Sequence, residues 1–391
     1  MQKLAIIITH PIQYYAPVFK LLHQRHNISI KVFYTWGEAV QQKFDPGFGK
    51  TISWDIPLLE GYPYEWVKNI ASDPGSHHAK GIDNPGLIEQ INAWQPDALL
   101  VYGWFYKSHL KAIRYFKGKV PVIFRGDSTL LDAAGGLKTI LRSIYLRWVY
   151  SHVDHALYTG SNNKAYFKKF GLKESQLTFA PHAVDNDRFA LTRTGEAEAL
   201  RKQLNIGTDE KLLLFAGKLE NKKSPALLLR AFIELNISGT HLLFTGNGIL
   251  EIELKNQASL YKNVHFMEFQ NQQQMPVVYQ GCDLFCLPSK GPGETWGLAV
   301  NEAMACGKAI LISDKVGAGT DLVKEGQNGS IFKADNLDDL KSKLKTLLQT
   351  EKTTLFTMGR QSQSIIADWS FTHQVQAIEQ LTNKCRKTAK R

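Results

Sequence analysis

The chain of 391 residues is long enough for two domains of about 100–200 residues each. Hydrophobic residues make up 43% of it and charged residues 21%, as in ordinary globular proteins, which excludes a fibrous or extensively disordered protein. The 47 basic and 36 acidic side chains leave a net charge of +11, which favours an anionic partner such as a nucleotide, a nucleic acid or a membrane surface.

The first half of the chain alternates short apolar runs with helix-like segments. The opening run, Leu4–Ile8, predicts a buried strand, which a helix at Val18–His26 and a second strand at Ile28–Tyr34 follow. Further strands are expected at Ala98–Val101, Val120–Phe124, Ala156–Tyr158 and Leu177–Ala180. Strands that alternate with helices indicate a parallel sheet covered on both faces.

The stretch from Trp36 to Pro85 departs from this pattern. It is rich in glycine, proline and aromatic residues and has weak periodicity, so we expect loops that shape a pocket. His77 and His78 lie within it and could suggest a metal. Because no partner stands at ligand spacing, an ordinary surface loop is the expectation there.

An apolar helical stripe is predicted over residues 137–148. Its members, spaced as i, i+3, i+4, i+7, i+8 and i+11, are Leu137, Ile140, Leu141, Ile144, Tyr145 and Trp148. The basic residues off the stripe and on one face of the preceding helix are Lys138, Arg142, Arg147, Lys107, Lys111 and Arg114. The stripe either packs on its own domain, the commoner arrangement, or lies on an anionic bilayer together with the basic C-terminal tail.

Targeting and cysteine signals are weak. The N-terminal apolar run is too short for a signal-peptide core, and no stretch approaches the roughly 18 apolar residues of a membrane-spanning helix. We therefore expect a cytoplasmic protein, peripheral on the inner face of the membrane if the stripe meets a bilayer. Four cysteines are too few for a disulfide scaffold, and Cys282 and Cys286 are expected to be buried thiols.

The strand–helix pattern restarts in the second half. The expected strands are Leu212–Phe215, His241–Phe244, Val264–Glu268, Leu284–Leu287, Ala309–Ile312 and Ser330–Phe332, with a helix at Ala226–Leu235. The sequence thus predicts two doubly wound α/β domains, 1–185 and 186–370. Residues 371–391 are expected to form a C-terminal helix, which could cross back to the first domain, and a basic tail. Ligands of such sheets bind at the carboxyl ends of the strands.

The segment after Leu284–Leu287 carries the strongest chemical signal. A glycine-bearing loop leads into a helix that starts near Gly297–Leu298, where free backbone N–H groups suit a phosphate or a sugar hydroxyl. Glu294 lies just before this helix and Glu302 one turn inside it. Their carboxylates could bind paired sugar hydroxyls, or Glu294 could cap the helix while Glu302 is solvated.

Three other patterns accompany this segment. Lys218 and Lys223 could hold a diphosphate beside a helix start, or lie on a solvated turn. Gly246 and Gly248 would let the backbone approach a ligand, although a plain turn is the expected interpretation. The D-x-D of residues 185–187 lies in the interdomain linker and not at a strand end, so no metal site is expected.

Together these residues resemble retaining glycosyltransferase family 4, whose members have the GT-B fold. Its E-x7-E region is similar to GETWGLAVNEAMACGKAILISDKVGAGTDLV, where Glu294 and Glu302 have the family's spacing. Its phosphate-binding G-R-L…K-G segment resembles GKLENKKS, and its interdomain P-N-G-V-D…F signature resembles PHAVDNDRF. The resemblance is specific in the second half and topological in much of the first.

The resemblance implies roles for these residues. Glu302 would bind the ribose of a nucleotide sugar and Glu294 the transferred sugar. Backbone amides of residues 296–298 would meet the sugar or the phosphates; these residues are Trp296, Gly297 and Leu298. Lys218 and Lys223 would neutralise the diphosphate leaving group. The donor would be a UDP-sugar, with a GDP-sugar as the second option, and no metal or tightly bound cofactor would be required.

Three departures from the family pattern lie on the acceptor side or beside the phosphates. Lys218 replaces the usual arginine and loses its bidentate fork. His10 and Gln13 stand where the family often has a glycine-rich loop, and they could reach the cleft. Where a histidine often follows a strand, this chain has Arg125 and Asp127, which could contact phosphate and orient an acceptor hydroxyl, or form an internal ion pair.

The resulting hypothesis is a retaining hexosyl- or N-acetylhexosaminyltransferase that uses a nucleotide sugar and a glycan or lipid-linked acceptor in polysaccharide biosynthesis. A nucleotide-sugar epimerase or a phosphorylase of the same fold is the enzymatic alternative. A basic nucleic-acid-binding protein is the alternative from another class, although no recognition motif supports it. A dinucleotide-dependent oxidoreductase is disfavoured because no strand–GxGxxG–helix unit occurs.

Overall fold

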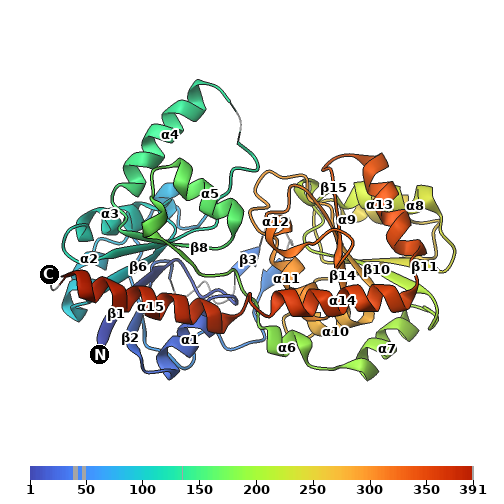
Figure 1. Ribbon diagram of the computed structural model, residues 1–391, viewed down its shortest axis with the longest axis horizontal. Coiled ribbons are helices and arrows are strands. Elements are labelled where there is room, and N and C mark those ends of the chain that lie inside the picture. Colours follow the sequence, from blue (N-terminus) through green and yellow to red (C-terminus); the bar gives the residue numbers. More distant parts are fainter. Residues whose placement is uncertain (38–42, 46–49, 134, 390–391) are drawn as a thin grey trace. The chain divides into compact units, whose positions relative to one another are not determined.

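The computed structural model describes residues 1–37, 43–45, 50–133 and 135–389. The chain folds into two compact units. The first comprises Met1–Lys43, Ile56–His182 and Phe371–Arg391, and the second comprises Phe44–Asp55 and Ala183–Ser370 (Figure 1). Within the described ranges, no helix combines the length and the hydrophobicity needed to cross a bilayer.

The first unit is built on a parallel seven-stranded sheet in the order β5-β2-β1-β6-β7-β8-β9. Its strands are β1 (Gln2–Ile8), β2 (Ile28–Tyr34), β5 (Tyr64–Trp66), β6 (Ala98–Tyr102), β7 (Val122–Arg125), β8 (His155–Tyr158) and β9 (Leu177–Phe179). Its helices are α1 (Ala16–Gln24), α2 (Leu87–Trp94), α3 (Lys107–Phe116), α4 (Leu137–Tyr150), α5 (Ser161–Lys169) and α15 (Phe371–Ala389). The order reverses between β1 and β6, so the loops after these two strands flank a topological switch point.

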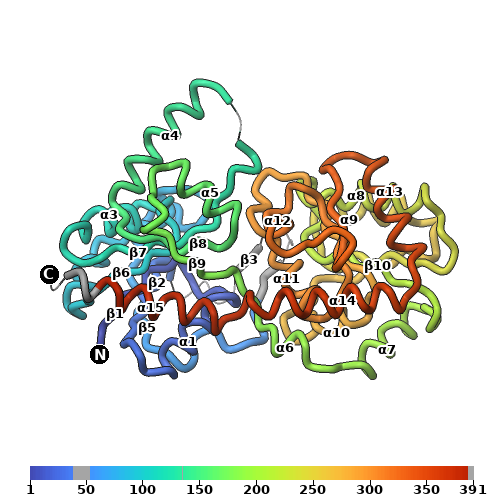
Figure 2. Tube along the Cα trace, in the orientation of Figure 1, coloured from blue at the N-terminus to red at the C-terminus, as the bar shows by residue number. Residues whose placement is uncertain are grey.

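Two apolar clusters cover the two faces of this sheet. Because side chains alternate along a strand, Leu4 and Ile6 of β1 join one cluster while Ala5 and Ile7 join the other. Helices α1 and α15 supply the first cluster, and α2 to α5 supply the second. Figure 2 shows the C-terminal α15 running beside α1. The guanidinium of Arg25 joins these two helices by donating to both carboxylate oxygens of Glu379, at 3.0 and 3.1 Å.

The expectation that Trp36–Pro85 consists of loops is corrected by the structure. Strand β5 pairs in parallel with β2 at the sheet edge, and β3 (Lys43–Asp45) and β4 (Lys50–Ile52) form a small two-stranded sheet. Each of these strands has three residues, which is too short for an alternating pattern to be recognised. Residues 38–42 and 46–49 of the predicted loop lie outside the described residues.

The second unit carries a parallel six-stranded sheet in the order β12-β11-β10-β13-β14-β15. Its strands are β10 (Lys211–Ala216), β11 (Thr240–Thr245), β12 (Val264–Met267), β13 (Leu284–Leu287), β14 (Ala309–Ser313) and β15 (Gly329–Phe332). Its helices are α6 (Asn186–Ala190), α7 (Thr194–Gln203), α8 (Pro225–Leu235), α9 (Glu251–Gln257), α10 (Met275–Gly281), α11 (Leu298–Ala305), α12 (Gly319–Leu322), α13 (Leu337–Gln349) and α14 (Lys352–Ile366). The predicted two doubly wound parallel sheets are therefore confirmed.

The switch point of the second sheet lies between β10 and β13. From β10, the next two strands along the chain, β11 and β12, extend the sheet toward one edge, whereas β13, β14 and β15 extend it toward the other. The connections that leave β10 and β13 consequently diverge, and ligands of open α/β sheets bind at the carboxyl ends of the strands at such a point. Both segments singled out by the sequence, the lysine-bearing loop and the glutamate-bearing loop, follow these two strands.

Candidate functional site

The site in the second unit starts from the loops that leave β10 and β13. Lys223 lies in the short helical turn Asn221–Lys223 after β10, and Glu294 lies in the loop after β13. Although 71 residues separate them, the Lys223 ammonium pairs with Glu294 Oε2. The same oxygen accepts a hydrogen bond from Ser289 Oγ at 2.8 Å. The switch point therefore brings together a cation and a carboxylate that the sequence places far apart.

Glu294 is buried, with 8% of its side chain exposed. Burial of a carboxylate is costly unless it is paired and hydrogen-bonded, and Lys223 and Ser289 meet both conditions. Glu294 is not the cap of α11, because Gly297 occupies the N-cap position and no side chain caps the helix. The N–H of Val300 donates to Gly297 O at 2.9 Å, so the N–H groups of Leu298 and Ala299 are the donors at this helix start that a ligand beside Glu294 could meet.

The start of α11 is held by the loop that follows β14. Gly297 has φ +95°, and a Cβ there would approach Val316 Cγ1 to 2.8 Å, so glycine is needed on both conformational and steric grounds. The N–H of Gly317 donates to Glu294 O at 3.1 Å, and the N–H of Ala318 donates to Trp296 O at 2.9 Å. These bonds fix the backbone that carries Glu294 and the helix start.

Glu302 is buried inside the second unit, where it is 5% exposed. Its Oε2 accepts a hydrogen bond from the Tyr279 hydroxyl at 2.9 Å. The interpretation of Glu302 as a solvated helix residue is therefore wrong. The Trp296 indole N–H donates to Asn301 Oδ1 at 2.8 Å, so this side chain is buried in the second unit.

Gly246 and Gly248, which follow β11, allow the loop after β11 to pack closely against the loop after β10. A Cβ on Gly246 would lie 2.2 Å from Gly217 O, and a Cβ on Gly248 would lie 2.4 Å from Leu219 O. The loop after β10 therefore approaches the loop after β11 in a way that side chains would prevent. This packing positions Lys218, which lies between Gly217 and Leu219.

In the first unit, the loop after β1 carries His10 and Gln13 at that sheet's own switch point. The Thr9 hydroxyl and His10 Nδ1 are 2.9 Å apart. The His10 ring also meets the edge of Trp36, with ring centroids 5.5 Å apart. His10 is therefore oriented by two neighbours, and Gln13 is partly exposed beside it.

Arg125, at the end of β7, is 1% exposed, and its guanidinium donates hydrogen bonds to backbone carbonyl oxygens. Its guanidinium donates to Ala180 O at 2.8 Å and to Pro181 O at 3.1 Å, and it lies 5.7 Å from the Tyr15 ring centroid. The arginine is therefore bonded to the segment that follows β9, at Ala180 and Pro181. They do not form the internal ion pair with Asp127 that the sequence left open.

Asp127 has a histidine partner that sequence reasoning missed. Its Oδ2 lies 3.8 Å from His182 Nε2, and its side chain is 49% exposed whereas that of His182 is 5% exposed. Burial lowers the pKa of His182, and the nearby Asp127 carboxylate opposes this shift. The sequence feature that could have pointed to His182 is the PHAVD segment, where this histidine replaces the asparagine of the P-N-G-V-D signature.

The D-x-D and the cysteines have structural roles. Asp185 Oδ1 accepts the N–H of Arg188 at 3.1 Å and so caps α6. Asn186 Nδ2 donates to Ile366 O at 3.0 Å and ties α6 to the end of α14. All four cysteines are free and buried, which confirms the prediction for Cys282 and Cys286. Burial raises the pKa of the Cys282 thiol to about 12, so it stays protonated.

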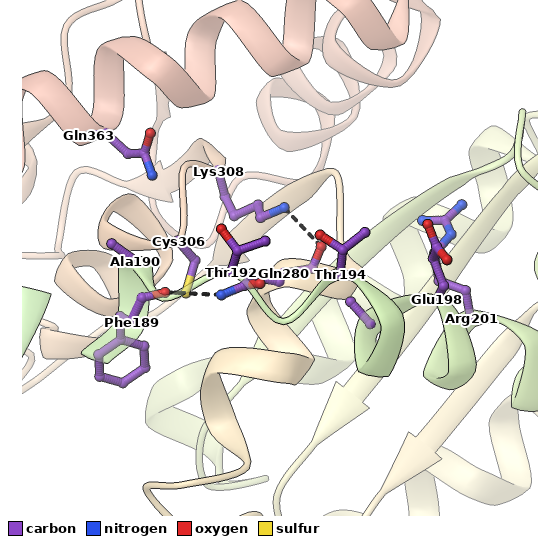
Figure 3. A pocket seen from close by; sticks show the side chains of 11 residues that line it. Phe189, Ala190, Thr192, Thr194, Glu198, Arg201, Gln280, Cys306, Lys308 and Gln363 are labelled. Carbon is purple, nitrogen blue, oxygen red and sulfur yellow. Dashed lines mark hydrogen bonds between the residues drawn. The ribbon is translucent and has the colours of Figure 1, made fainter. Parts of the chain in front are cut away.

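A cavity of about 280 Å³ in the second unit lies away from these loops (Figure 3). It borders Lys308, which immediately precedes β14, so the cavity is at the amino ends of the strands. The Lys308 ammonium donates to Gln280 O at 3.0 Å and to Cys282 O at 2.9 Å. Because this cation is engaged by main-chain carbonyls, the cavity offers no comparable site for a phosphate.

Comparisons with known proteins bear on this geometry. Residues 196–358 match the sequence model of glycosyl transferases group 1, a range that includes the site of the second unit. The chain is 28% identical over 356 residues to D-inositol 3-phosphate glycosyltransferase of Mycolicibacterium smegmatis, covering 84% of this chain and 79% of that one. It is 26% identical to the corresponding protein of Nocardia farcinica, over 82% and 76% of the two chains.

Solved structures show the same fold. HepE of Anabaena in complex with UDP and glucose matches with a TM-score of 0.72 and 17% identity, over 98% of this chain and 100% of that one. Sucrose-phosphate synthase of Thermosynechococcus elongatus matches with a TM-score of 0.73 and 16% identity, over 99% and 100%. The predicted GT-B fold is thereby confirmed, and the comparisons together support a glycosyltransferase.

The contacts of Arg125 generate a stability prediction. We expect Arg125→Ala to lower the free energy of unfolding of the first unit by about 3 kcal/mol, because two buried carbonyls lose their donors at about 1–3 kcal/mol each. Urea denaturation followed by circular dichroism measures this change. The exposed Arg142→Ala is the control, expected to stay within about 0.5 kcal/mol of wild type. Equal stabilities of the two variants would contradict the role assigned to Arg125.

Proposed function

We propose that the protein transfers a sugar from a nucleoside-diphosphate donor to a glycan or lipid-linked acceptor, with retention of anomeric configuration. The observation that carries this proposal is the Lys223–Glu294 pair beside the uncapped start of α11. It combines a cation for a diphosphate, a carboxylate for sugar hydroxyls and the start of a helix at the carboxyl ends of two neighbouring strands. The match of residues 196–358 to glycosyl transferases group 1 supports it.

The proposed donor lies along the crevice of the second unit. Glu302 binds the ribose hydroxyls, Glu294 binds the hydroxyls of the transferred sugar, and the amides of residues 296–298 meet the sugar or the phosphates. Lys218 and Lys223 stabilise the negative charge that grows on the diphosphate as the glycosidic bond breaks, which is the largest electrostatic contribution. A UDP-sugar is the favoured donor and a GDP-sugar the second option. The complex of HepE with UDP and glucose supports the first.

Retention requires no carboxylate nucleophile in this proposal. The acceptor attacks on the face that the diphosphate leaves, and the departing phosphate takes the acceptor's proton. Because two lysines supply the positive charge, no metal ion is required for this step. In the first unit, the half-exposed Asp127 orients an acceptor hydroxyl, backed by His182, while Arg125 positions the chain after β9.

A nucleotide-sugar test follows from these assignments. Glu302→Gln retains the acceptor atom for Tyr279 but loses a charge, so we expect UDP affinity to fall about 10-fold or more, since hydrogen bonds to charged groups contribute about 1.5–3 kcal/mol. Glu294→Gln should reduce UDP release from UDP-sugars more than it reduces UDP affinity. Calorimetry and a UDP-release assay measure the two quantities.

The matched control is Glu198→Gln, which changes an exposed glutamate of the same unit. If all three variants bound UDP and turned over like wild type, the site assignment would fail. Product analysis separates the alternatives, because an epimerase needs no acceptor and a phosphorylase needs free phosphate. Binding of a DNA duplex in place of any nucleoside diphosphate would favour the nucleic-acid-binding alternative.

We further propose that α4 rests on an anionic membrane at the cytoplasmic face. Its stripe points away from the unit: the exposed fractions are Leu137 72%, Ile140 58%, Leu141 60%, Ile144 62%, Tyr145 42% and Trp148 40%. The opposite face, with Leu146, Val149 and Tyr150, provides the packing. The four aliphatic residues of the stripe are therefore exposed and not packed on their own unit, whereas the Tyr145 ring meets that of Trp104 at a centroid distance of 5.7 Å. In Figure 1, α4 stands out beyond α3 and α5.

The charges around α4 fit a bilayer with anionic lipids. Lys138, Arg142 and Arg147 are exposed beside the stripe, and the Arg114 guanidinium of α3 lies 5.3 Å from the Trp148 ring centroid. Each basic residue near such a surface contributes about 1 kcal/mol, which adds to the burial of the apolar side chains. An enzyme bound to the membrane through α4 would encounter a lipid-linked acceptor in that same membrane.

Vesicle cosedimentation tests this contact. Wild type should bind vesicles rich in phosphatidylglycerol at low salt, and Ile140→Ser with Ile144→Ser should weaken binding at least about 10-fold, since each buried CH₂ contributes about 0.8 kcal/mol. Ile252→Ser with Leu260→Ser removes comparably exposed apolar side chains from the second unit as a control. Absence of wild-type binding, or an equal loss in both double variants, would refute the proposal.

A further inference from the structure

Three potential metal ligands converge in the loop between β5 and α2. Asp73, His77 and His78 place one ligand atom each within 4.8 Å of one another. Asp73 Oδ2 lies 3.3 Å from His77 Nε2 and 3.1 Å from His78 Nε2. The carboxylate therefore stands between two imidazole nitrogens that both point at it.

These distances suit a small divalent ion. Zinc binds histidine nitrogen and carboxylate oxygen at about 2.0–2.2 Å, so two ligand atoms in a tetrahedral shell lie about 3.3 Å apart. The carboxylate-to-imidazole distances already have this length.

Close backbone packing and hydrogen bonds fix the loop that carries these ligands. A Cβ on Gly81 would lie 2.2 Å from Gly75 O, so the two glycines bring opposite sides of the loop into contact. Asn69 Nδ2 donates to Gly81 O at 2.9 Å, and Asn69 Oδ1 accepts the N–H of Asp83 at 2.8 Å. Because the backbone is already ordered, an ion would not have to offset the entropy of closing it.

We propose that Asp73, His77 and His78 form a binding site for a divalent transition ion, Zn²⁺ in the first instance. Two imidazoles and one carboxylate suit such ions better than Mg²⁺, which prefers oxygen ligands. Water completes the shell at the fourth position. The site lies in the first unit and is independent of the nucleotide crevice proposed in the second. The expectation that His77 and His78 have no partner at ligand spacing is wrong, because the Asp73 carboxylate, four residues before His77, reaches both imidazoles.

Calorimetric titration of metal-free, untagged protein with zinc chloride tests the site. Wild type should bind one equivalent, and Asp73→Asn and the double change His77→Ala/His78→Ala should each weaken binding at least about 10-fold, as expected when a metal loses a ligand. Cobalt(II) added in place of zinc should give the intense visible absorption of a tetrahedral complex.

Two controls separate this site from other histidines and from the proposed function. His23→Ala/His26→Ala removes another histidine pair of the first unit, whose ring centroids are 5.9 Å apart, and should bind zinc like wild type. Glu302→Gln should also bind zinc normally, whatever its UDP affinity. Thermal melting checks that each variant is folded. Unchanged binding in Asp73→Asn and in the double histidine variant, or no stoichiometric binding by wild type, would overturn the proposal.

Discussion

The buried ion pair between Lys223 and Glu294 is the interaction on which the candidate site depends. A carboxylate taken out of water costs several kcal/mol unless a partner compensates it, so Glu294 holds its place only because Lys223 and Ser289 reach the same oxygen. That meeting in turn requires β10 and β13 to be neighbours with their carboxyl ends at one edge. The strand order thus positions the charged side chains, and a ligand phosphate would meet an electrostatic environment that exists before it binds.

Close backbone packing explains why so many glycines surround this crevice. Gly246, Gly248 and Gly317 each stand where a Cβ would collide with the carbonyl oxygen of a neighbouring loop. The loops after four strands therefore support one another in two pairs, β10 with β11 and β13 with β14, through close main-chain contacts. An arrangement of this kind keeps donors and acceptors oriented before a substrate arrives, and preorganised dipoles act without the cost of reorganisation.

The sequence predicted the long, continuously apolar strands to within one or two residues, because buried parallel strands such as β2 and β13 are largely apolar. It did not reveal β5, whose three residues carry no periodicity. The E-x7-E spacing located Glu294 and Glu302, but whether Glu302 was buried depended on Tyr279 of another helix. His182 is 55 residues from Asp127, and only the fold brings them together. For α4, the stripe was visible in the sequence, whereas the side that packs was not.

Helix α15 gives the first unit a particular order of assembly. Its Val375, Ile378 and Leu381 belong to the same apolar cluster as Leu4 and Ile6, so a face of the first sheet is finished by residues at the other end of the chain. During synthesis, α1 can cover its part of that face early, but the part beneath α15 stays exposed until the second unit has been synthesised. Exposed apolar surface of this kind makes an incomplete chain prone to aggregation, so the first unit is protected only once α15 has docked.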